Sequence, residues 1–463
     1  MGNLRRTRYC GEVRLPDAGQ EMVVAGSIAK CRDKGGIIFA DLRDTTGILQ
    51  LVFDDGTDRD VFAKAQSLRS EYVVIAKGLL RERDAKTTKI ATGDVELYVS
   101  ELRVLSEAET TPFEIRDEVS VKDELRLKYR YLDLRRESMH QPLMVRSRIC
   151  QIVRNYFCDH HFTEIETPIL MKSTPEGARD YLVPSRVQPG RFYALPQSPQ
   201  LYKQLLMLSG FDRYFQIARC FRDEDLRADR QPEFTQIDLE MSFVDDNDIM
   251  TLNEGLIKTL WKEILNVDVA TPFQRMPWDE AMNRFGSDKP DTRFGLEILD
   301  VSEAVRGTEF VPFKAALEAG GTVRCINCKG MADKLTRKNI DKLAADAKTY
   351  GIKGLAYTRL TAENETSSFE KFLTEEEKAA LRAAAGLETG DVLLVAADAN
   401  WVKACTALGQ IRLLVAKKYD LIDQSKFNFL WVTDFPLFEY SEEEGRWMAL
   451  PHPFSLPRAD CID

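Results

Sequence analysis

The sequence predicts an α+β protein of about three domains, and three observations support this prediction. The chain has 463 residues, whereas a single hydrophobic core stops growing near ~250–300 residues. Its first 105 residues alternate short apolar segments with turn residues, and the later segments mix helical periodicity with strand-like runs. With 44% hydrophobic and 30% charged residues, the composition is that of an ordinary globular protein.

Composition and charge exclude several classes of protein. The sequence contains no run of about 18 apolar residues, so no membrane span is predicted, and the N-terminus lacks the apolar stretch of a secretory signal. We therefore expect a cytoplasmic location. A net charge of −10 argues against binding DNA or RNA with the whole surface and leaves only local basic patches for such contacts.

Cysteine usage indicates reduced thiols rather than a disulfide framework. The nine cysteines are odd in number and irregularly spaced, which is typical of a reducing compartment. Cys325 and Cys328 form a Cys-x-x-Cys pair with no second pair nearby. Because a structural zinc ion normally needs four ligands, no metal site is predicted.

The first 105 residues predict a small β-barrel. Five segments of strand length carry β-branched or aromatic residues, and they lie at 22–28, 36–42, 47–53, 72–78 and 95–99. Between the third and fourth segments, residues 60–68 repeat apolar side chains at helical spacing. This order is typical of the OB-fold, a partly open barrel that binds oligonucleotides, although another small barrel fits the pattern nearly as well.

The rest of the chain predicts a larger α+β domain with an insertion. Residues 106–140 begin with an acidic, Pro-containing linker, and a helix is expected from about 145 to 160. Two long antiparallel strands joined by a charged loop are expected within 213–243, followed by a helix at 249–264. Residues 288–421 shift in composition, with expected helices at 338–349 and 375–385, and an apolar aromatic strand is expected at 429–438. We therefore divide the chain into 1–105, 106–140, 141–287, an inserted α+β domain at 288–421, and 422–463.

The charged loop between the two long strands is the first candidate for chemistry. It contains Arg222, Arg227 and Arg230, and Phe234 follows it. Guanidinium groups bind phosphate oxygens through paired hydrogen bonds, and an aromatic face stacks on a purine. The loop therefore suits a nucleoside triphosphate, although the sequence lacks the glycine patterns of a P-loop or a Rossmann site. A solvated charged hairpin is the alternative interpretation.

Several motifs in this region carry a family resemblance. Residues 211–224 and 234–240 closely resemble motif 2 of class II aminoacyl-tRNA synthetases of the bacterial aspartyl type. Residues 127–136, 174–186 and 194–206 extend the resemblance, and residues 162–168 resemble the end of motif 1, whose proline, here Pro168, lies at the dimer interface in the family. The resemblance implies an OB-fold anticodon-binding domain at 1–105, a hinge at 106–140, and a catalytic domain with an antiparallel sheet. That catalytic domain comprises 141–287 and 422–463, the latter incomplete.

The family activity implied by this resemblance is aspartate–tRNA ligation by a homodimer. ATP and Mg²⁺ activate L-aspartate to aspartyl-adenylate, which is transferred to tRNA(Asp), with tRNA(Asn) left open as a second acceptor. The resemblance implies that Arg222 is catalytic, because it holds the α-phosphate and the substrate carboxylate. Further ATP contacts are implied for Asp223, Glu224, Arg230, Gln231 and Phe234.

The same resemblance assigns an aspartate pocket. Residues that resemble the ammonium-binding groups of the family are Glu176, Gln200 and Asp238, and Ser198 lines the same pocket. Lys203 is implied to meet the side-chain carboxylate of aspartate, and His452 to close the pocket. A lysine in this place favours aspartate over asparagine, because a neutral amide would leave the ammonium group unpaired.

The barrel is implied to read the anticodon. Phe39 matches a residue that stacks on an anticodon base, and Arg32 and Gln50 match residues that contact bases or backbone. By resemblance, Lys34 stands where the family has Leu in enzymes that charge only tRNA(Asp) or His in enzymes that also charge tRNA(Asn). A lysine there does not indicate which of the two kinds this chain is. Residues 1–40 contain seven Lys or Arg against four Asp or Glu, so an acidic chain still offers RNA a locally basic surface.

Some departures from the family pattern bear on function. Ser27 replaces the usual Trp, His161 replaces the usual Gly, and Leu450-Pro451-His452 lacks one pocket histidine. The chain as written ends at Asp463 without a match to motif 3 or to the main Mg²⁺-binding residues. We therefore expect this polypeptide as written to form aspartyl-adenylate poorly. The alternatives are an asparaginyl or lysyl relative, and a non-catalytic tRNA-binding paralogue.

Overall fold

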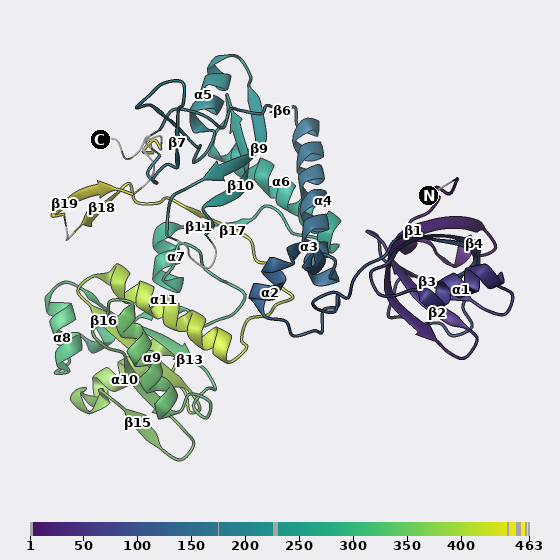
Figure 1. Cartoon of the computed structure of the whole chain (residues 1–463). Coiled ribbons are helices and arrows are strands. Elements are labelled where there is room, and N and C mark those ends of the chain that lie inside the picture. Colours follow the sequence, from purple (N-terminus) through teal and green to yellow (C-terminus); the bar gives the residue numbers. More distant parts are fainter. Residues whose placement is uncertain are drawn as a thin grey trace. The chain divides into compact units, whose positions relative to one another are not determined.

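The computed structural model describes residues 3–174, 176–225, 230–441, 444–450, 455–458 and 461 (Figure 1). The chain divides into two compact units, residues 1–147 and 148–463, and each is described by itself. Within these described ranges, no helix is both long enough and apolar enough to cross a membrane.

The first unit contains a closed five-stranded barrel. Its strands are β1 (Glu21–Asp33), β2 (Ile38–Arg43), β3 (Ile48–Phe53), β4 (Val73–Glu82) and β5 (Val95–Ser106), in the order β1-β2-β3-β5-β4. Helix α1 (Arg59–Ser67) lies between β3 and β4, and two single turns, η1 (Cys10–Glu12) and η2 (Leu15–Asp17), precede the barrel. The predicted OB-fold order is confirmed. The barrel is closed rather than partly open, because β3 and β5 pair in parallel at Leu51 and Leu97.

Side-chain alternation separates the barrel's core from its outer face. Ile38, Ala40 and Leu42 of β2 are buried in the barrel core. Phe39 and the other odd-numbered residues of β2 therefore face outward, because successive side chains of a strand point to opposite sides.

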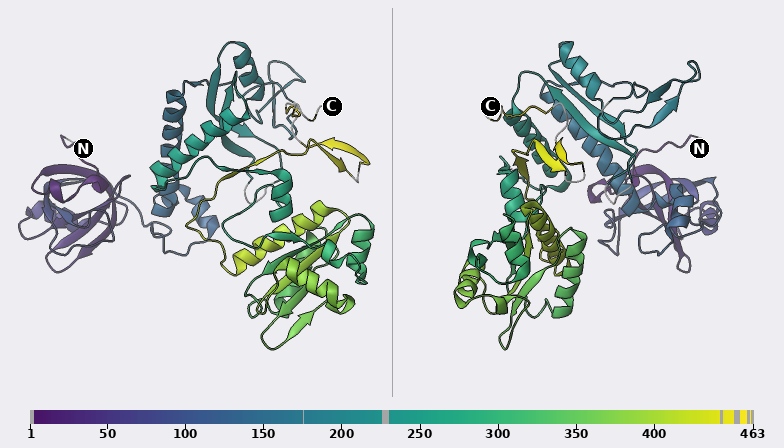
Figure 2. Two further views of the ribbon diagram at one scale, coloured as in Figure 1. Left: turned by 180° about the vertical axis from the view of Figure 1, so that it is seen from behind. Right: turned by 90° about the vertical axis from the view of Figure 1, so that its left-hand side faces the viewer.

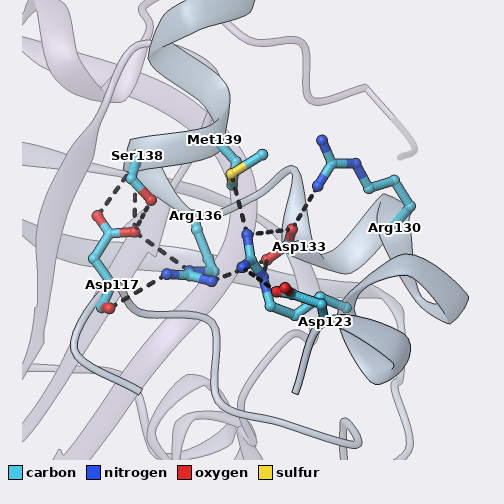
Figure 3. Close-up of polar contacts among 8 residues, drawn as sticks. Asp117, Asp123, Arg130, Asp133, Arg136, Ser138 and Met139 are labelled. Carbon is cyan, nitrogen blue, oxygen red and sulfur yellow. Dashed lines mark hydrogen bonds and ion pairs between the residues drawn. The ribbon is translucent and has the colours of Figure 1, made fainter. Parts of the chain in front are cut away.

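A network of ion pairs organises the segment that follows the barrel. Helices α2 (Asp123–Lys128) and α3 (Arg130–Asp133) are short, and α4 (Glu137–Asp159) begins after them. The fully buried carboxylate of Asp133 accepts hydrogen bonds from Arg126 (3.1 Å), Arg130 (2.8 Å) and Arg136 (3.0 Å) (Figure 3). Arg136 also contacts Asp117, whose carboxylate caps the start of α4 through Ser138.

Glu71 connects this segment to the barrel. Its carboxylate is 3% exposed and accepts hydrogen bonds from Arg43 on β2 (2.7 Å) and from Arg135 (2.5 Å). Glu71 itself has a left-handed backbone (φ 66°), and its amide donates to Ile28 of β1. Two guanidinium groups thus share one buried carboxylate, which holds residues 130–136 against the barrel wall.

The second unit is built around a small sheet whose strands are β6 (Thr163–Glu164), β9 (Arg213–Phe221) and β10 (Glu233–Met241), in the order β10-β9-β6. Strands β9 and β10 are antiparallel, as predicted, and β6 runs parallel to β9. The C-terminal part of α4 and helix α6 (Asp246–Leu265) pack on this sheet around Phe157 and Phe215. Beside it lie the hairpin β7 (Leu182–Pro184) and β8 (Phe192–Ala194), and helix α5 (Gln200–Leu208).

Two sequence expectations at the edges of this unit are wrong. Helix α4 begins at Glu137 rather than near residue 145, because Leu143, Met144 and other apolar residues of its first turns are exposed and hide the periodicity. The strand expected at 429–438 is two strands, β17 (Leu430–Thr433) and β18 (Phe438–Ser441), interrupted at Asp434, whose φ is +56°. Strand β18 pairs with β19 (Arg446–Ala449), and β17 pairs in parallel with β11 (Gln274–Pro277).

Residues between β11 and β17 form the inserted domain, green in Figures 1 and 2. After α7 (Trp278–Phe285), its five strands take the order β12-β13-β16-β14-β15. They are β12 (Ile298–Asp300), β13 (Thr322–Cys328), β14 (Ala356–Leu360), β15 (Glu365–Ser367) and β16 (Val392–Asp398). Helices α9 (Arg337–Thr349) and α11 (Trp401–Lys418) cover one face of the sheet. Helices α8 (Val311–Glu318) and α10 (Glu375–Ala385) cover the other face, with single turns η3 (Glu303–Val305) and η4 (Glu370–Phe372).

The two faces separate the Cys-x-x-Cys pair. Cys325 is buried in the core beneath α8 and α10, whereas Cys328 is buried in the core beneath α9 and α11. Burial raises the pKa of each thiol to about 12. The two sulfur atoms therefore lie on opposite sides of the sheet and do not form a joint metal site.

Arg412 on α11 fastens the start of the inserted domain to its last helix. Its guanidinium and Nε groups donate to the backbone carbonyls of four residues, at distances of 2.7–3.2 Å, namely Asp291, Phe294, Gly295 and Leu296. The rings of Phe285 and Phe294 lie 4.9 and 4.0 Å from its guanidinium carbon. Burial lowers the pKa of Arg412 to about 10.

Replacement of Asp133 by Asn should destabilise the first unit. Burial alone would raise the pKa of Asp133, but Arg126 and Arg136 outweigh it and hold the pKa below its ordinary value of 3.8. Neutralising the carboxylate leaves three guanidinium groups without their shared partner, so a loss of about 3 kcal/mol in unfolding free energy is expected at pH 7. Native-state hydrogen exchange of residues 113–140 measures this loss.

The pH dependence and a control make this prediction specific. Because the folded-state pKa is depressed, the stabilisation is present above about pH 4 and is lost as the pH falls further, so wild type and variant should converge in acid. Glu114→Gln, which removes a solvent-exposed pair with Arg116, should change stability by less than about 0.5 kcal/mol. Equal effects of the two substitutions would contradict the role of Asp133.

Candidate functional site

Strands β9 and β10 form the floor of the candidate site. Their register places Gln216 opposite Asp238 and Cys220 opposite Phe234, so the even-numbered residues of both strands share one face. The ladder continues beyond β9, because the amide of Arg222 donates to the carbonyl of Pro232 at 2.9 Å. The guanidinium carbon of Arg222 lies 5.2 Å from the centre of the Phe234 ring. The structure therefore brings together Arg222, Phe234 and Asp238, which the sequence assigned to one site.

A buried ion pair occupies the middle of this face. Lys203, on the first turn of α5, donates to Asp238 Oδ1 at 2.9 Å, and its Nζ lies 3.4 Å from Glu240 Oε2. The side chains of Lys203 and Asp238 are only 11% and 9% exposed. Burial raises the pKa of Asp238, and the nearby Lys203 opposes this rise. One ammonium group therefore compensates two carboxylates here.

Two buried charged atoms of the site lack a hydrogen-bond partner among the residues that the structure describes, although the Tyr214 hydroxyl lies near enough to the Asp238 carboxylate to lower its pKa. One is Oδ2 of Asp238, an acceptor, and the other is Nε of Arg222, a donor. A buried polar group without a partner costs about 1–3 kcal/mol, and native proteins keep few of them. The negatively charged oxygen of Asp238 can accept a hydrogen bond from a cationic group, and the positively charged Nε group of Arg222 can donate one to an anionic group. This face therefore suits a ligand that carries both a positive and a negative charge.

Cys220 shows how closely the charged groups surround this face. Burial raises the pKa of its thiol to about 11, and the negative charge of Asp238 adds to the rise. Arg222 and Lys203 oppose the rise, whereas Glu176 contributes to it. Four of the predicted site residues, from four separate segments, therefore act on one buried thiol at the floor of the site.

The segment before β7 supplies Glu176. Thr174 donates to its Oε1 at 2.9 Å, and Ser198 donates to its Oε2 at 2.7 Å. Gln200 is the half-buried first residue of α5, one turn before Lys203. The predicted amino acid pocket is thus lined by one loop, one helix start and one strand pair.

The remaining nucleotide residues lie where the chain leaves β9. Glu224 and Arg230 form an ion pair of 2.9 Å, and Gln231 next to them is exposed. The amide of Asp223 donates to the carbonyl of Arg179. His452 and the loop residues 226–229 lie outside the described residues.

The predicted RNA-binding residues share the outer face of the barrel. Arg32 of β1 lies opposite Phe39 of β2 and donates to Asp41 at 2.8 Å, while Lys34 is exposed in the turn between these strands. Gln50 is also on this side but is only 4% exposed. Its amide accepts a hydrogen bond from Arg83 (2.6 Å) and donates to Glu96 (3.2 Å), so both of its ends are occupied.

Pro168, expected at a dimer interface, is exposed in the described chain. It is followed by Ile169 and Leu170, whose apolar side chains are 44% and 52% exposed. Exposed apolar residues of this kind are available for contact with a second chain.

Some site residues were not foreseen from the sequence. Glu240 and Gln216 lie on the same face as Asp238, and the two-residue alternation of the predicted strands was sufficient to find them. Arg83 follows the end of β4 and Glu96 lies at the start of β5, and both contact Gln50 on β3, which is distant from them in the sequence, so no local signal marks them. No group of three or more His, Cys, Asp or Glu side chains suited to a metal ion occurs within the described ranges.

Comparison with known proteins identifies families for both units. Residues 122–462 match the tRNA synthetases class II (D, K and N), and residues 22–105 match the OB-fold nucleic acid binding domain. The chain is 55% identical over 466 residues to the aspartate–tRNA ligase of Agathobacter rectalis, covering 100% of this chain and 78% of that protein. It is 52% identical over 465 residues to the aspartate–tRNA(Asp/Asn) ligase of Caldanaerobacter subterraneus, with the same coverage.

A solved structure agrees in fold. The asparaginyl-tRNA synthetase from Pyrococcus horikoshii in complex with asparaginyl-adenylate matches with a TM-score of 0.54 and 20% identity, covering 88% of this chain and 96% of that chain. At this identity the likeness concerns the fold alone.

The thiol of Cys220 should report the charges of the site. With a pKa of about 11 and no exposed surface, it should react with iodoacetamide at pH 8 far more slowly than the exposed Cys158, because the thiol is buried and only about 0.1% of it is thiolate. Asp238→Asn removes a charge that raises this pKa and should accelerate alkylation of Cys220 several-fold. Lys203→Met should slow it. Alkylation of each cysteine is measured by peptide mass spectrometry.

The rate at Cys158 serves as the internal control, since it should be the same in all variants. Equal alkylation of Cys220 in wild type, Asp238→Asn and Lys203→Met would contradict the arrangement of charges described above.

Proposed function

Because the chain belongs to the class II tRNA synthetases, within the bacterial aspartate–tRNA ligases, we propose that it activates L-aspartate with ATP and transfers it to tRNA(Asp). The observation that carries this proposal is the pair of buried, unpartnered atoms, Asp238 Oδ2 and Arg222 Nε. An α-amino acid presents an ammonium group and a carboxylate at a short separation. The ammonium group can donate a hydrogen bond to Asp238 Oδ2, and the carboxylate can accept one from Arg222 Nε.

Recognition of the amino acid uses three sets of groups. Asp238 and Glu176 receive the α-ammonium group together with the amide of Gln200, and Ser198 holds the Glu176 carboxylate in place. Lys203 meets the side-chain carboxylate of aspartate. Asparagine is disfavoured there, because its neutral amide cannot compensate a buried ammonium group. His452 completes the pocket in this proposal.

The chemical step is an in-line displacement at the α-phosphorus of ATP. A carboxylate oxygen of aspartate attacks, pyrophosphate leaves, and aspartyl-adenylate forms. Arg222 contacts both the α-carboxylate and the α-phosphate, so its positive charge stabilises the negative charge that grows between them. Phe234 stacks on adenine. Asp223, Glu224, Arg230 and Gln231 contact the remainder of the nucleotide, with Arg230 directed to the outer phosphates.

Mg²⁺ would neutralise phosphate charge during this step when bound. The residues described in the structure contain no three-ligand cluster for it, so none of them is assigned to the ion.

Binding of tRNA is assigned to the outer face of the barrel. Phe39 stacks on an anticodon base, and Arg32 and Lys34 contact neighbouring bases or phosphates, whereas the buried amide of Gln50 is bonded to Arg83 and Glu96 and is not assigned to RNA. One of the relatives above is named an aspartate–tRNA ligase and the other an aspartate–tRNA(Asp/Asn) ligase. Charging assays with both tRNAs therefore distinguish a single acceptor from two.

We also assign a homodimer contact to Pro168 and the apolar residues that follow it. Their exposure supports this assignment. Sedimentation of the intact protein measures the oligomeric state.

Replacement of Lys203 by Met should remove the preference for aspartate over asparagine. Loss of a charged hydrogen bond of about 1.5–3 kcal/mol corresponds to a roughly 10- to 100-fold weaker affinity for aspartate. Isothermal titration with each amino acid measures both affinities. Lys258→Met, which alters an exposed lysine on α6, should leave both unchanged. Unaltered aspartate binding by Lys203→Met would contradict the assignment of this pocket.

Replacement of Phe39 by Ala should weaken tRNA(Asp) binding about tenfold or more, because one stacked base contributes about 1–3 kcal/mol. Filter binding at fixed salt concentration measures the change. Leu79→Ala, on β4 of the same barrel, is the matched control and should bind tRNA as the wild type does. A protein that binds tRNA with Phe39 but binds neither aspartate nor ATP would instead be the non-catalytic tRNA-binding paralogue.

A further inference from the structure

We propose that Gln197 is a positioning residue that holds the loop carrying Glu176 in its aspartate-binding conformation. This inference rests on the function proposed above, and it assigns a specific role to a residue whose side-chain amide bonds to the loop itself. Gln197 lies in the turn before α5, next to Ser198, and is only 2% exposed.

Both ends of the Gln197 amide are bonded to the same loop residue. Its Oε1 accepts a hydrogen bond from the amide of Ala178 at 3.1 Å, and its Nε2 donates to the carbonyl of Ala178 at 2.8 Å. The side chain therefore pairs with the backbone of Ala178 as a neighbouring strand would. Because Ala178 is two residues beyond Glu176, this pairing fixes the loop close to the carboxylate that binds the substrate ammonium group.

A second contact closes the loop at its base. Nε2 of Gln197 also donates to Asp180 Oδ1 at 2.5 Å, and Ser173 donates to the other oxygen of the same carboxylate at 2.5 Å. Residues 173 and 180 are thereby joined across the loop. Gln197 thus contacts the loop both at Ala178, in its middle, and at Asp180, where its two ends are joined.

Neighbouring segments depend on the same arrangement. The amide of Asp223, at the start of the nucleotide loop, donates to the carbonyl of Arg179, and the amide of Leu195 donates to the carbonyl of Tyr181. Ser198 binds the carboxylate of Glu176 while the adjacent Gln197 binds the backbone. Two consecutive residues therefore align Glu176 with the start of α5, where Gln200 and Lys203 lie.

The loop needs such an external constraint because its own backbone is permissive. Gly177 has a φ of +96°, and a Cβ added there would meet no neighbouring atom, so local packing does not hold this turn. An amide side chain offers a donor and an acceptor on one planar group, as the pairing with the backbone of Ala178 requires. A carboxylate at position 197 would lose both donations and face Asp180, and an apolar side chain would lose all three bonds.

The test compares Gln197→Met and Gln197→Glu with wild type in the intact protein. Aspartate affinity, measured by isothermal titration, should fall about tenfold or more in both variants at pH 8, since two or three hydrogen bonds to the loop are lost, one of them to the Asp180 carboxylate. The tRNA(Asp) affinity should stay within about twofold, because the proposed tRNA-binding face belongs to the barrel, and ATP affinity should fall less than aspartate affinity, because the nucleotide loop is joined to this loop only through the Asp223 amide among the bonds described above. Gln188→Met, at an exposed position in the turn between β7 and β8, is the matched control and should bind aspartate normally.

Two further readouts separate positioning from a general effect on folding. Trypsin cleavage after Lys172 and Arg179 should accelerate in the Gln197→Met protein relative to cleavage after Lys258. The Gln197→Glu protein should recover part of its aspartate affinity relative to wild type when the pH is lowered, because a protonated carboxyl group regains one donor; Gln197→Met should show no such recovery.

The outcomes distinguish failure of this inference from failure of the proposed function. Normal aspartate binding by Glu176→Ala would overturn the assignment of the pocket itself. Weak binding by Glu176→Ala with normal binding by Gln197→Met would overturn the positioning role alone. Equal losses of aspartate, ATP and tRNA affinity in Gln197→Met would show that Gln197 serves the fold of the whole unit, and would also overturn the proposal.

Discussion

The buried ion pair between Lys203 and Asp238 is the constraint on which the rest of the catalytic unit depends. A carboxylate at this depth is stable as an anion only with a cation beside it, and the cation must come from a different element, the start of α5. This fixes the helix against β10. Glu240 adds a second negative charge near the same ammonium group, so the pair carries an excess of negative charge. A cationic group of a ligand would therefore compensate the excess negative charge at the floor of the site.

At three other places in the described chain, at Asp133, Glu71 and Arg412, buried charge is fully compensated, and there it has a structural effect. Asp133 receives three guanidinium groups, Glu71 receives two, and Arg412 donates to four carbonyls. None of these groups is left with an unpartnered buried atom among those of the described side chains. The networks at Asp133, Glu71 and Arg412 have all their buried hydrogen-bonding atoms paired, and they fix segments of backbone. At the site, Asp238 and Arg222 each keep one unpaired buried atom that a ligand can bond.

The sequence predicted elements best where local chemistry and tertiary packing agree. Helix α10 has the predicted bounds, because Thr374 and Glu377 form a capping box at its start and Gly386 adopts a left-handed conformation at its end. The family comparison also marked His161 as a usual glycine, and its φ of +65° gives the physical reason. Prediction failed where packing overrides pattern, as at Asp434, which breaks an apolar run. The site was predicted through motifs on β9 and β10, whereas the role of Gln197 depends on a loop whose path no periodicity reveals.

The pairing of β11 with β17 shows how the inserted domain is connected to the rest of the second unit. The two strands are separated by more than 150 residues of sequence, yet Gln274 lies opposite Leu430 and Pro277 opposite Thr433. Since the strands are parallel, the end of β11 and the start of β17 are about 10–13 Å apart, a gap that roughly four or five residues can span. The inserted domain has its own two-faced core and its own closure at Arg412. The inserted domain is therefore a separately packed module, and a short connector in its place would span the gap and preserve the strand pair.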